Sequence, residues 1–163
     1  MGQATYVYRP STGLYYPVTV QELEGELTLD VAQAGGIAAP PPYIADPGES
    51  LISVETYLIA NRLTTLDMTT AQFNFFACGI SDLVESYCNY SWRISEVAVP
   101  TGLQKVVANM IKVDIENSGK SQIYQSESMT GYSYSLAANI LPNSILSQFA
   151  VALAPYRVLN IWM

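Results

Sequence analysis

Two short blocks near the C-terminal end have the residue types that come closest to a chemical site. The first is Ser126-Glu127-Ser128 followed by Gly131-Tyr132-Ser133, and the second is Leu153-Ala154-Pro155-Tyr156-Arg157. A serine beside a carboxylate could be a nucleophile, but it would need a general base to activate and orient it. The chain has no histidine, and the basic residue nearest to this serine block is Lys120. We therefore expect no catalytic residue here and no enzyme activity.

Acidic side chains are the other candidates for chemistry. The densest group comprises Glu22, Glu24, Glu26 and Asp30. Its spacing lacks the Asp/Asn pattern and central glycine of a calcium-binding loop, so we interpret it as a solvated or lumen-facing acidic strip. Asp82 and Glu85 lie one helical turn apart and are expected on a solvent-exposed face. Because histidine, the commonest metal ligand, is also absent, the sequence predicts no metal site and no cofactor.

Composition favours a protein that is covered by partners. Half of the residues are hydrophobic and only 13% are charged, whereas soluble domains usually carry about 25% charged residues. The net charge is −7 and the seven basic residues are scattered. This distribution argues against tight binding of nucleic acid, but an acidic surface would suit a channel wall along which DNA slides. No stretch supplies the roughly 18 apolar residues of a membrane span. The two cysteines, Cys78 and Cys88, are expected to be free, since one helix separates them by about 15 Å.

Residues 1–50 differ in pattern from the rest. Strand-favouring tyrosines and valines on either side of a Pro- and Gly-containing break predict a hairpin of residues 4–8 against residues 14–20. A linker follows at residues 34–42, flexible at its glycines and stiff at its prolines. We predict an extended, partly β N-terminal arm over residues 1–50, with the domain boundary near Pro47-Gly48. The alternative, a small sheet packed on the helical domain, stays open.

Residues 51–157 are expected to form a mainly α domain of four helices with one β-hairpin. The first helix begins at Ser53, and the second begins at Thr69, which forms a capping box with Gln72, and runs to about Asn89. A loop anchored by Trp92 precedes the third helix, which starts after Pro100 and ends at residues 117–119. Residues 123–135 follow as the hairpin, and Pro142 opens the fourth helix. Apolar periodicity predicts core positions at Phe73, Phe76, Ile80, Val84, Val107, Met110 and Phe149.

The order of these elements, with the residues that begin and end them, resembles the head-tail connector (adaptor, or head-completion) proteins of long-tailed bacteriophages over residues 51–157. The resemblance is carried by four pieces in order: Tyr87-Cys88-Asn89-Tyr90-Ser91-Trp92, Val99-Pro100-Thr101-Gly102-Leu103-Gln104, the Ser126–Ser133 block, and Leu153…Tyr156-Arg157. It implies a homo-oligomeric ring, of twelve subunits, beneath the portal protein. The ring would extend the DNA channel without binding DNA specifically, and it would offer a platform to the next head-closure or tail protein. The location would be the virion neck, assembled in the cytoplasm of a bacterial host.

The resemblance also implies roles for particular residues. The tail, residues 158–163, and the two residues before it would dock on the portal through Tyr156, Arg157, Leu159, Ile161, Trp162 and Met163. The hairpin would lie at a subunit boundary or face the channel, through Tyr124, Ser126, Glu127, Ser128, Gly131, Tyr132 and Tyr134. Two alternatives remain open: another neck component, such as a head-closure or tail-terminator protein, or an acidic intracellular module that binds a host protein.

Overall fold

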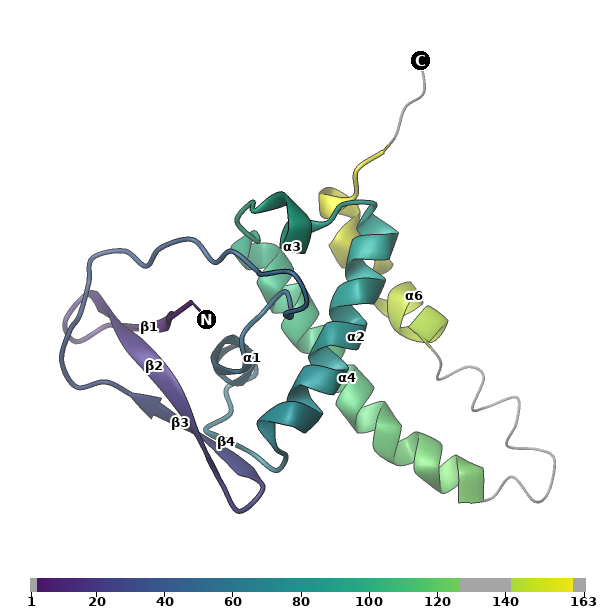
Figure 1. Cartoon of the computed structure of the whole chain (residues 1–163), viewed down its shortest axis with the longest axis horizontal. Coiled ribbons are helices and arrows are strands. Elements are labelled where there is room, and N and C mark those ends of the chain that lie inside the picture. Colours follow the sequence, from purple (N-terminus) through teal and green to yellow (C-terminus); the bar gives the residue numbers. More distant parts are fainter. Residues whose placement is uncertain (1–2, 127–141, 160–163) are drawn as a thin grey trace.

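The structure, a computed structural model, describes residues 3–126 and 142–159 and has two layers, a sheet and a group of helices (Figure 1). The sheet has four antiparallel strands in the order β1-β2-β3-β4. The fold is therefore mixed α/β, and the predicted mainly α domain of four helices with one hairpin is wrong. That prediction places only two of these four strands in the N-terminal region.

The sheet begins with the expected hairpin. Strand β1 (Thr5–Arg9) pairs with β2 (Leu14–Leu23), and β2 continues past its expected end to pair with β3 (Glu26–Val31). A two-residue turn joins β2 to β3, with φ of 54° at Glu24 and 79° at Gly25. Positive φ at both positions defines the tight hairpin turn that matches strand twist. Strand β4 (Thr65–Leu66) completes the sheet beside β3.

The N-terminal region is not an extended arm, because its sheet packs on the helices. Val18 and Leu27 are buried, and Leu27 belongs to the same core cluster as the helical residues. The Thr5 hydroxyl also hydrogen-bonds that of Ser53, at 2.7 Å, at the start of helix α1. An alternating strand leaves one apolar face, and covering that face removes it from water. The open alternative, a sheet packed on the helical domain, describes what is observed.

Helices α1 (Val54–Ala60) and α2 (Thr70–Cys88) follow the predicted signals closely. The Ser53 side chain accepts a hydrogen bond from the Thr56 N–H and so caps α1. Thr69 and Gln72 form both bonds of the capping box of α2, and Asn89 ends α2 in the left-handed conformation. The predicted starts of both helices and the predicted end of α2 are confirmed, because these signals are local and need no tertiary partner.

The helices from Trp92 onward agree only in part with those predicted from the sequence. The Trp92 loop contains a short helix, α3 (Trp92–Ser95), and the predicted fourth helix is present as α6 (Pro142–Leu153), followed by a 3-10 turn, η2 (Ala154–Tyr156). Helix α4 (Thr101–Ser126), however, continues through residues 117–119, where an end was predicted. A glycine weakens a helix by about 1 kcal/mol, which is too little to stop one that continues on both sides.

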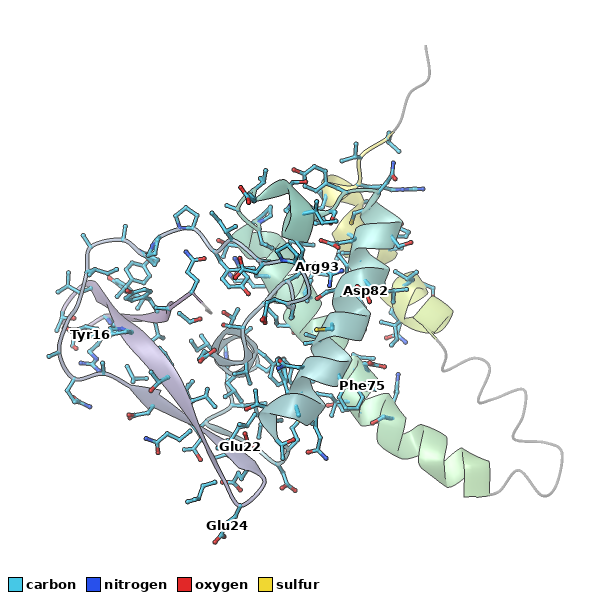
Figure 2. All side chains as sticks on the ribbon, in the orientation of Figure 1. Tyr16, Glu22, Glu24, Phe75, Asp82 and Arg93 are labelled. Atoms are coloured by element: carbon cyan, nitrogen blue, oxygen red, sulfur yellow. The ribbon has the colours of Figure 1, made fainter. Side chains whose placement is uncertain are left out.

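The core lies where α1, α2, α4 and α6 meet, with the sheet on one side (Figures 1 and 2). Among the expected core residues, five are buried: Phe73, Ile80, Val84, Val107 and Met110. Phe76 and Phe149 are half-buried and pack against this cluster. Within the described chain, no helix has the length and apolar character needed to cross a membrane.

Candidate functional site

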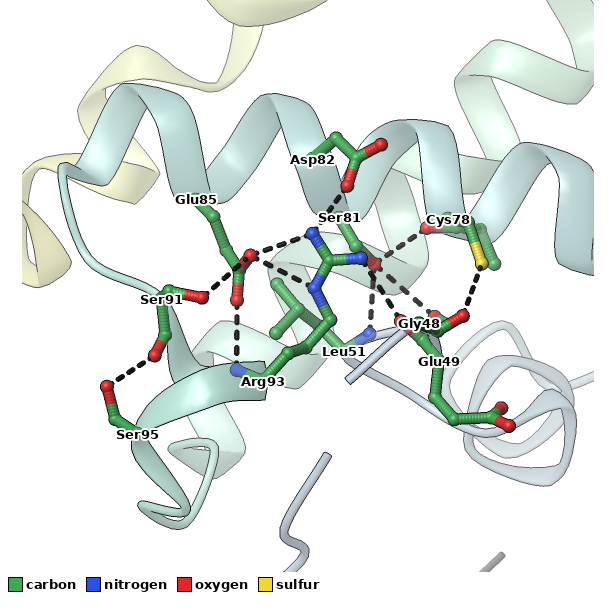
Figure 3. A network of polar contacts seen from close by, with 12 residues as sticks. Gly48, Glu49, Leu51, Cys78, Ser81, Asp82, Glu85, Ser91, Arg93 and Ser95 are labelled. Atoms are coloured by element: carbon green, nitrogen blue, oxygen red, sulfur yellow. Dashed lines mark hydrogen bonds and ion pairs between the residues drawn. The ribbon is translucent and has the colours of Figure 1, made fainter. Parts of the chain in front are cut away.

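The densest polar cluster joins α2, α3 and the loop before α1 (Figure 3). The Arg93 guanidinium donates to both Glu85 and Asp82 of α2, with a 2.7 Å contact to Glu85, and it also donates to the Glu49 carbonyl. Glu85 in addition accepts from the Arg93 main-chain N–H and from the Ser91 hydroxyl. The expected solvent-exposed face is therefore wrong for Glu85, whose side chain is 10% exposed, and holds only for Asp82, at 71%.

This cluster has a structural role. Burial by itself disfavours the charged guanidinium, but hydrogen bonds to Glu85 and Asp82 outweigh it and hold the pKa of Arg93 above its ordinary value. An arginine that is permanently charged and fully paired cannot exchange protons with a substrate. The cluster instead fixes α3 against α2.

Neither cysteine is an activated nucleophile. Both thiols are free, as expected, and burial raises the pKa of Cys78 and of Cys88. A raised pKa keeps a thiol protonated near neutral pH, and the thiolate is the reactive form. A cavity of about 390 Å³ between α2, α4 and α6 is lined in part by Asp114, and burial also raises the pKa of this residue. In the described part of the chain, no group of three or more acidic or cysteine side chains could hold a metal ion.

The expected portal-docking residues begin on the helical layer. Tyr156 is half-buried beside the first turn of α4, where a Cβ at Gly102 would collide with its hydroxyl. The Arg157 guanidinium lies 5.2 Å from the centre of the Tyr87 ring, and the Val158 N–H donates to the Cys88 carbonyl at 2.7 Å. Leu159 follows with 67% of its surface exposed. Ile161, Trp162 and Met163 lie outside the described residues.

The expected subunit-interface hairpin is divided by the end of α4. Tyr124 and Ser126 belong to the last turns of this helix, so a hairpin beginning at residue 123 is wrong for that part. Glu127, Ser128, Gly131, Tyr132 and Tyr134 lie outside the described residues. Figure 1 shows that the C-terminal part of α4 runs past α2 and α6, away from the core.

A cleft of about 610 Å³ lies between the sheet and the helices. Tyr6 of β1 lines one side, Ile59 of α1 and Lys105 of α4 line the other, and Tyr43 and Val99 also contribute. Burial raises the pKa of Tyr43 to about 12, with a further contribution from the negative charges of Glu49, Asp46 and Glu55. A largely apolar, aromatic cleft in which Lys105 is the one charged lining residue suits a mostly apolar or main-chain ligand.

Comparison with known proteins finds no counterpart for this arrangement: no family model matches the chain, and no curated protein or solved structure matches it significantly.

Sequence reasoning missed two of these features. The cleft does not follow from a predicted N-terminal arm, because it forms only where the sheet packs on the helices. Sequence reasoning also missed the ion pair of Arg93 with Glu85. A usable signal was the position of Arg93 directly after Trp92, which is buried. A charged side chain beside a buried residue is itself partly removed from water, so its charge needs a nearby group of opposite sign.

Proposed function

We propose that this chain is a ring-forming adaptor of a bacteriophage neck, placed between the portal and the tail. The ring would line the DNA passage and present a platform to the next neck or tail protein. Homo-oligomeric assembly agrees with the low charged content of 13%, because closing a ring buries surface that a monomer would expose.

The observation that carries the proposal is the course of α4. The first half of this helix is buried at Leu103, Val107 and Ile111, whereas its C-terminal part extends beyond the helices that pack on the first half (Figure 1). A helix end that leaves its own core gains little from the monomer, since most helix stability comes from tertiary packing. A neighbouring subunit would provide that packing.

A second support is the exposed apolar surface at the C-terminal end. Val158 and Leu159 are 42% and 67% exposed, and the sequence continues with Ile161, Trp162 and Met163. Aromatic residues and methionine are enriched at interface cores. A head-closure or tail-terminator protein would be expected to have a helix content well below one third, whereas the described helices alone exceed that share of the chain.

The test is electron microscopy of the protein co-expressed with the portal protein of its own genome and purified through a tag on the portal. A stoichiometric ring on the narrow end of the portal is expected. A truncation that ends at Val158 should lose the ring while keeping its fold, because Tyr156 and the Val158 N–H contact remain.

Val151→Ser is the matched control, because Val151 is 88% exposed on α6, outside the tail. This variant should keep the ring. If only free monomers are found and the truncation has no effect, the proposal is wrong.

A further inference from the structure

The outer edge of β1 has main-chain groups that point away from the sheet. Strand β1 is the first strand in the sheet order, so one of its sides has no neighbouring strand among the described residues. On β2, the Pro17 carbonyl accepts from the Ala32 N–H, on the side away from β1. Tyr15 also bonds on that side. Their partners across the ladder are Tyr6 and Tyr8. Because bonded and non-bonded pairs alternate in an antiparallel ladder, the N–H and C=O groups of Tyr6 and Tyr8 face outward.

The 610 Å³ cleft adjoins this edge, since Tyr6 lines it. Among its described lining residues only Lys105 is charged. A free strand edge beside a side-chain pocket is the geometry of strand addition, in which main-chain bonds give affinity and the pocket gives specificity.

We propose that residues 127–135 of a neighbouring copy of this chain add to β1 as a strand, with side chains in the cleft. This proposal rests on the ring proposed above and names the contact that would join its subunits. The interface would be heterologous, joining two different surfaces, as a ring requires.

The same molecule's segment is too short to occupy its own cleft. From Lys105, beside the cleft, α4 rises about 32 Å to Ser126, at about 1.5 Å per residue. Asp114 and Ile145 line one cavity, so α6 starts beside the middle of α4, about 14 Å along the helix from Lys105. The fully extended connection of residues 127–141 spans about 54 Å, against about 46 Å for the route to the cleft and back. The length left over corresponds to about two residues, which are too few to pair with both Tyr6 and Tyr8.

The sequence of the segment suits the cleft. Tyr132 and Tyr134 alternate with serines, a pattern typical of strands. Glu127 is the only charged residue between Lys120 and Arg157, and it matches the one charged residue of the cleft, Lys105. The chemistry of the two surfaces is therefore complementary.

The test uses a fluorescein-labelled synthetic peptide of residues 126–137, titrated with the full-length protein and followed by fluorescence anisotropy. Saturable binding to the wild type is expected. Tyr6→Pro should weaken the affinity about tenfold, because proline removes the outward N–H donor and its ring obstructs the edge. Tyr6→Val removes the same side chain but keeps the donor, so it should bind the peptide more tightly than Tyr6→Pro does. Because Pro17 already occupies the opposite position of the ladder, a proline at residue 6 leaves the bonds between β1 and β2 intact.

A second measurement needs no variant. In the wild-type protein, the peptide should slow hydrogen exchange at the Tyr6 and Tyr8 amides. The proposal is overturned if the peptide does not bind, if Tyr6→Pro binds it as well as Tyr6→Val, or if a peptide of residues 157–163 displaces it and protects the same amides. None of these results depends on the portal. Peptide binding without a ring on the portal would refute the neck function alone, and a ring without peptide binding would refute this contact alone.

Discussion

The sheet and the helical layer of this molecule are stabilised in different ways. The helices remove several side chains completely from solvent, among them Phe73, Val84 and Met110. In the sheet, Leu27 is the one residue with no solvent-accessible surface. The helices are also linked by the paired Arg93, while the ion pairs of the described chain include none on the sheet. Stability is thus concentrated in the helices. The sheet, with a free edge, is better suited to accept a partner.

The largest effect is expected in the helical core. Phe73→Ala should lower the free energy of unfolding by about 4 kcal/mol, because it removes a buried ring that packs at a tilted angle against Tyr57 and leaves a cavity. Urea denaturation followed by circular dichroism measures this loss. A change below about 1 kcal/mol would show that the core is not centred on α2.

Removing the carboxylate of Glu85 is the second test. Glu85→Ala should cost about 3 kcal/mol, because the Arg93 guanidinium, whose side chain is 12% exposed, would lose its buried partner. Asp82→Ala is the matched control and should cost less than about 1 kcal/mol, since Asp82 is exposed. Equal losses in thermal denaturation would contradict the buried role of Glu85.

The attachment of the sheet is tested at its buried residue. Leu27→Ala should cost about 2 to 3 kcal/mol and should speed hydrogen exchange in β2 and β3 more than in α2. If exchange rises uniformly in both layers, the two layers unfold as one unit and the contrast between them fails.

Tyr57 provides a pH test of the boundary between the layers. Burial, followed by the negative charge of Glu116, raises the pKa of Tyr57 to about 12 from the ordinary value of 10. The folded state therefore keeps its proton where the unfolded state loses it, so the contribution to stability is complete below pH 10 and is lost as pH rises to 12. Relative to Tyr57→Phe, the wild type should lose about 2 kcal/mol over this range in urea titrations. Parallel pH profiles would show that Tyr57 is accessible to solvent.

The smallest effect is expected at two glycines. Gly25→Ala should cost about 1 kcal/mol, because an alanine is strained at φ of 79° although space is available. Gly79→Ala on α2 also meets no neighbouring atom, and it should stabilise by about 0.5 to 1 kcal/mol through helix propensity. Melting temperatures that shift in the same direction would contradict the turn geometry between β2 and β3.

Features that depend on neighbouring residues could be predicted from the sequence. The capping box at Thr69, the stop at Asn89 and the helix opened by Pro142 each need only a few adjacent residues, and all are present. The alternation of β3 is also in the sequence, with Leu27 and Leu29 between acidic and polar residues. The interpretation as an acidic strip considers only the charges, whereas the period of two predicts the strand.

Local signals in the sequence are enough to predict where α1, α2, α4 and α6 begin and where the first hairpin lies. The composition adds the absence of histidine, the net negative charge and the low share of charged residues. Four features emerge only from contacts between distant segments: the sheet covers the helices, α4 continues past its predicted end, Glu85 is buried, and a cleft adjoins the edge of β1. The two groups of features differ in how far apart along the chain the interacting residues lie. Caps and turns are settled by hydrogen bonds within a few residues, whereas burial, strand order and free edges depend on segments that are far apart in the chain.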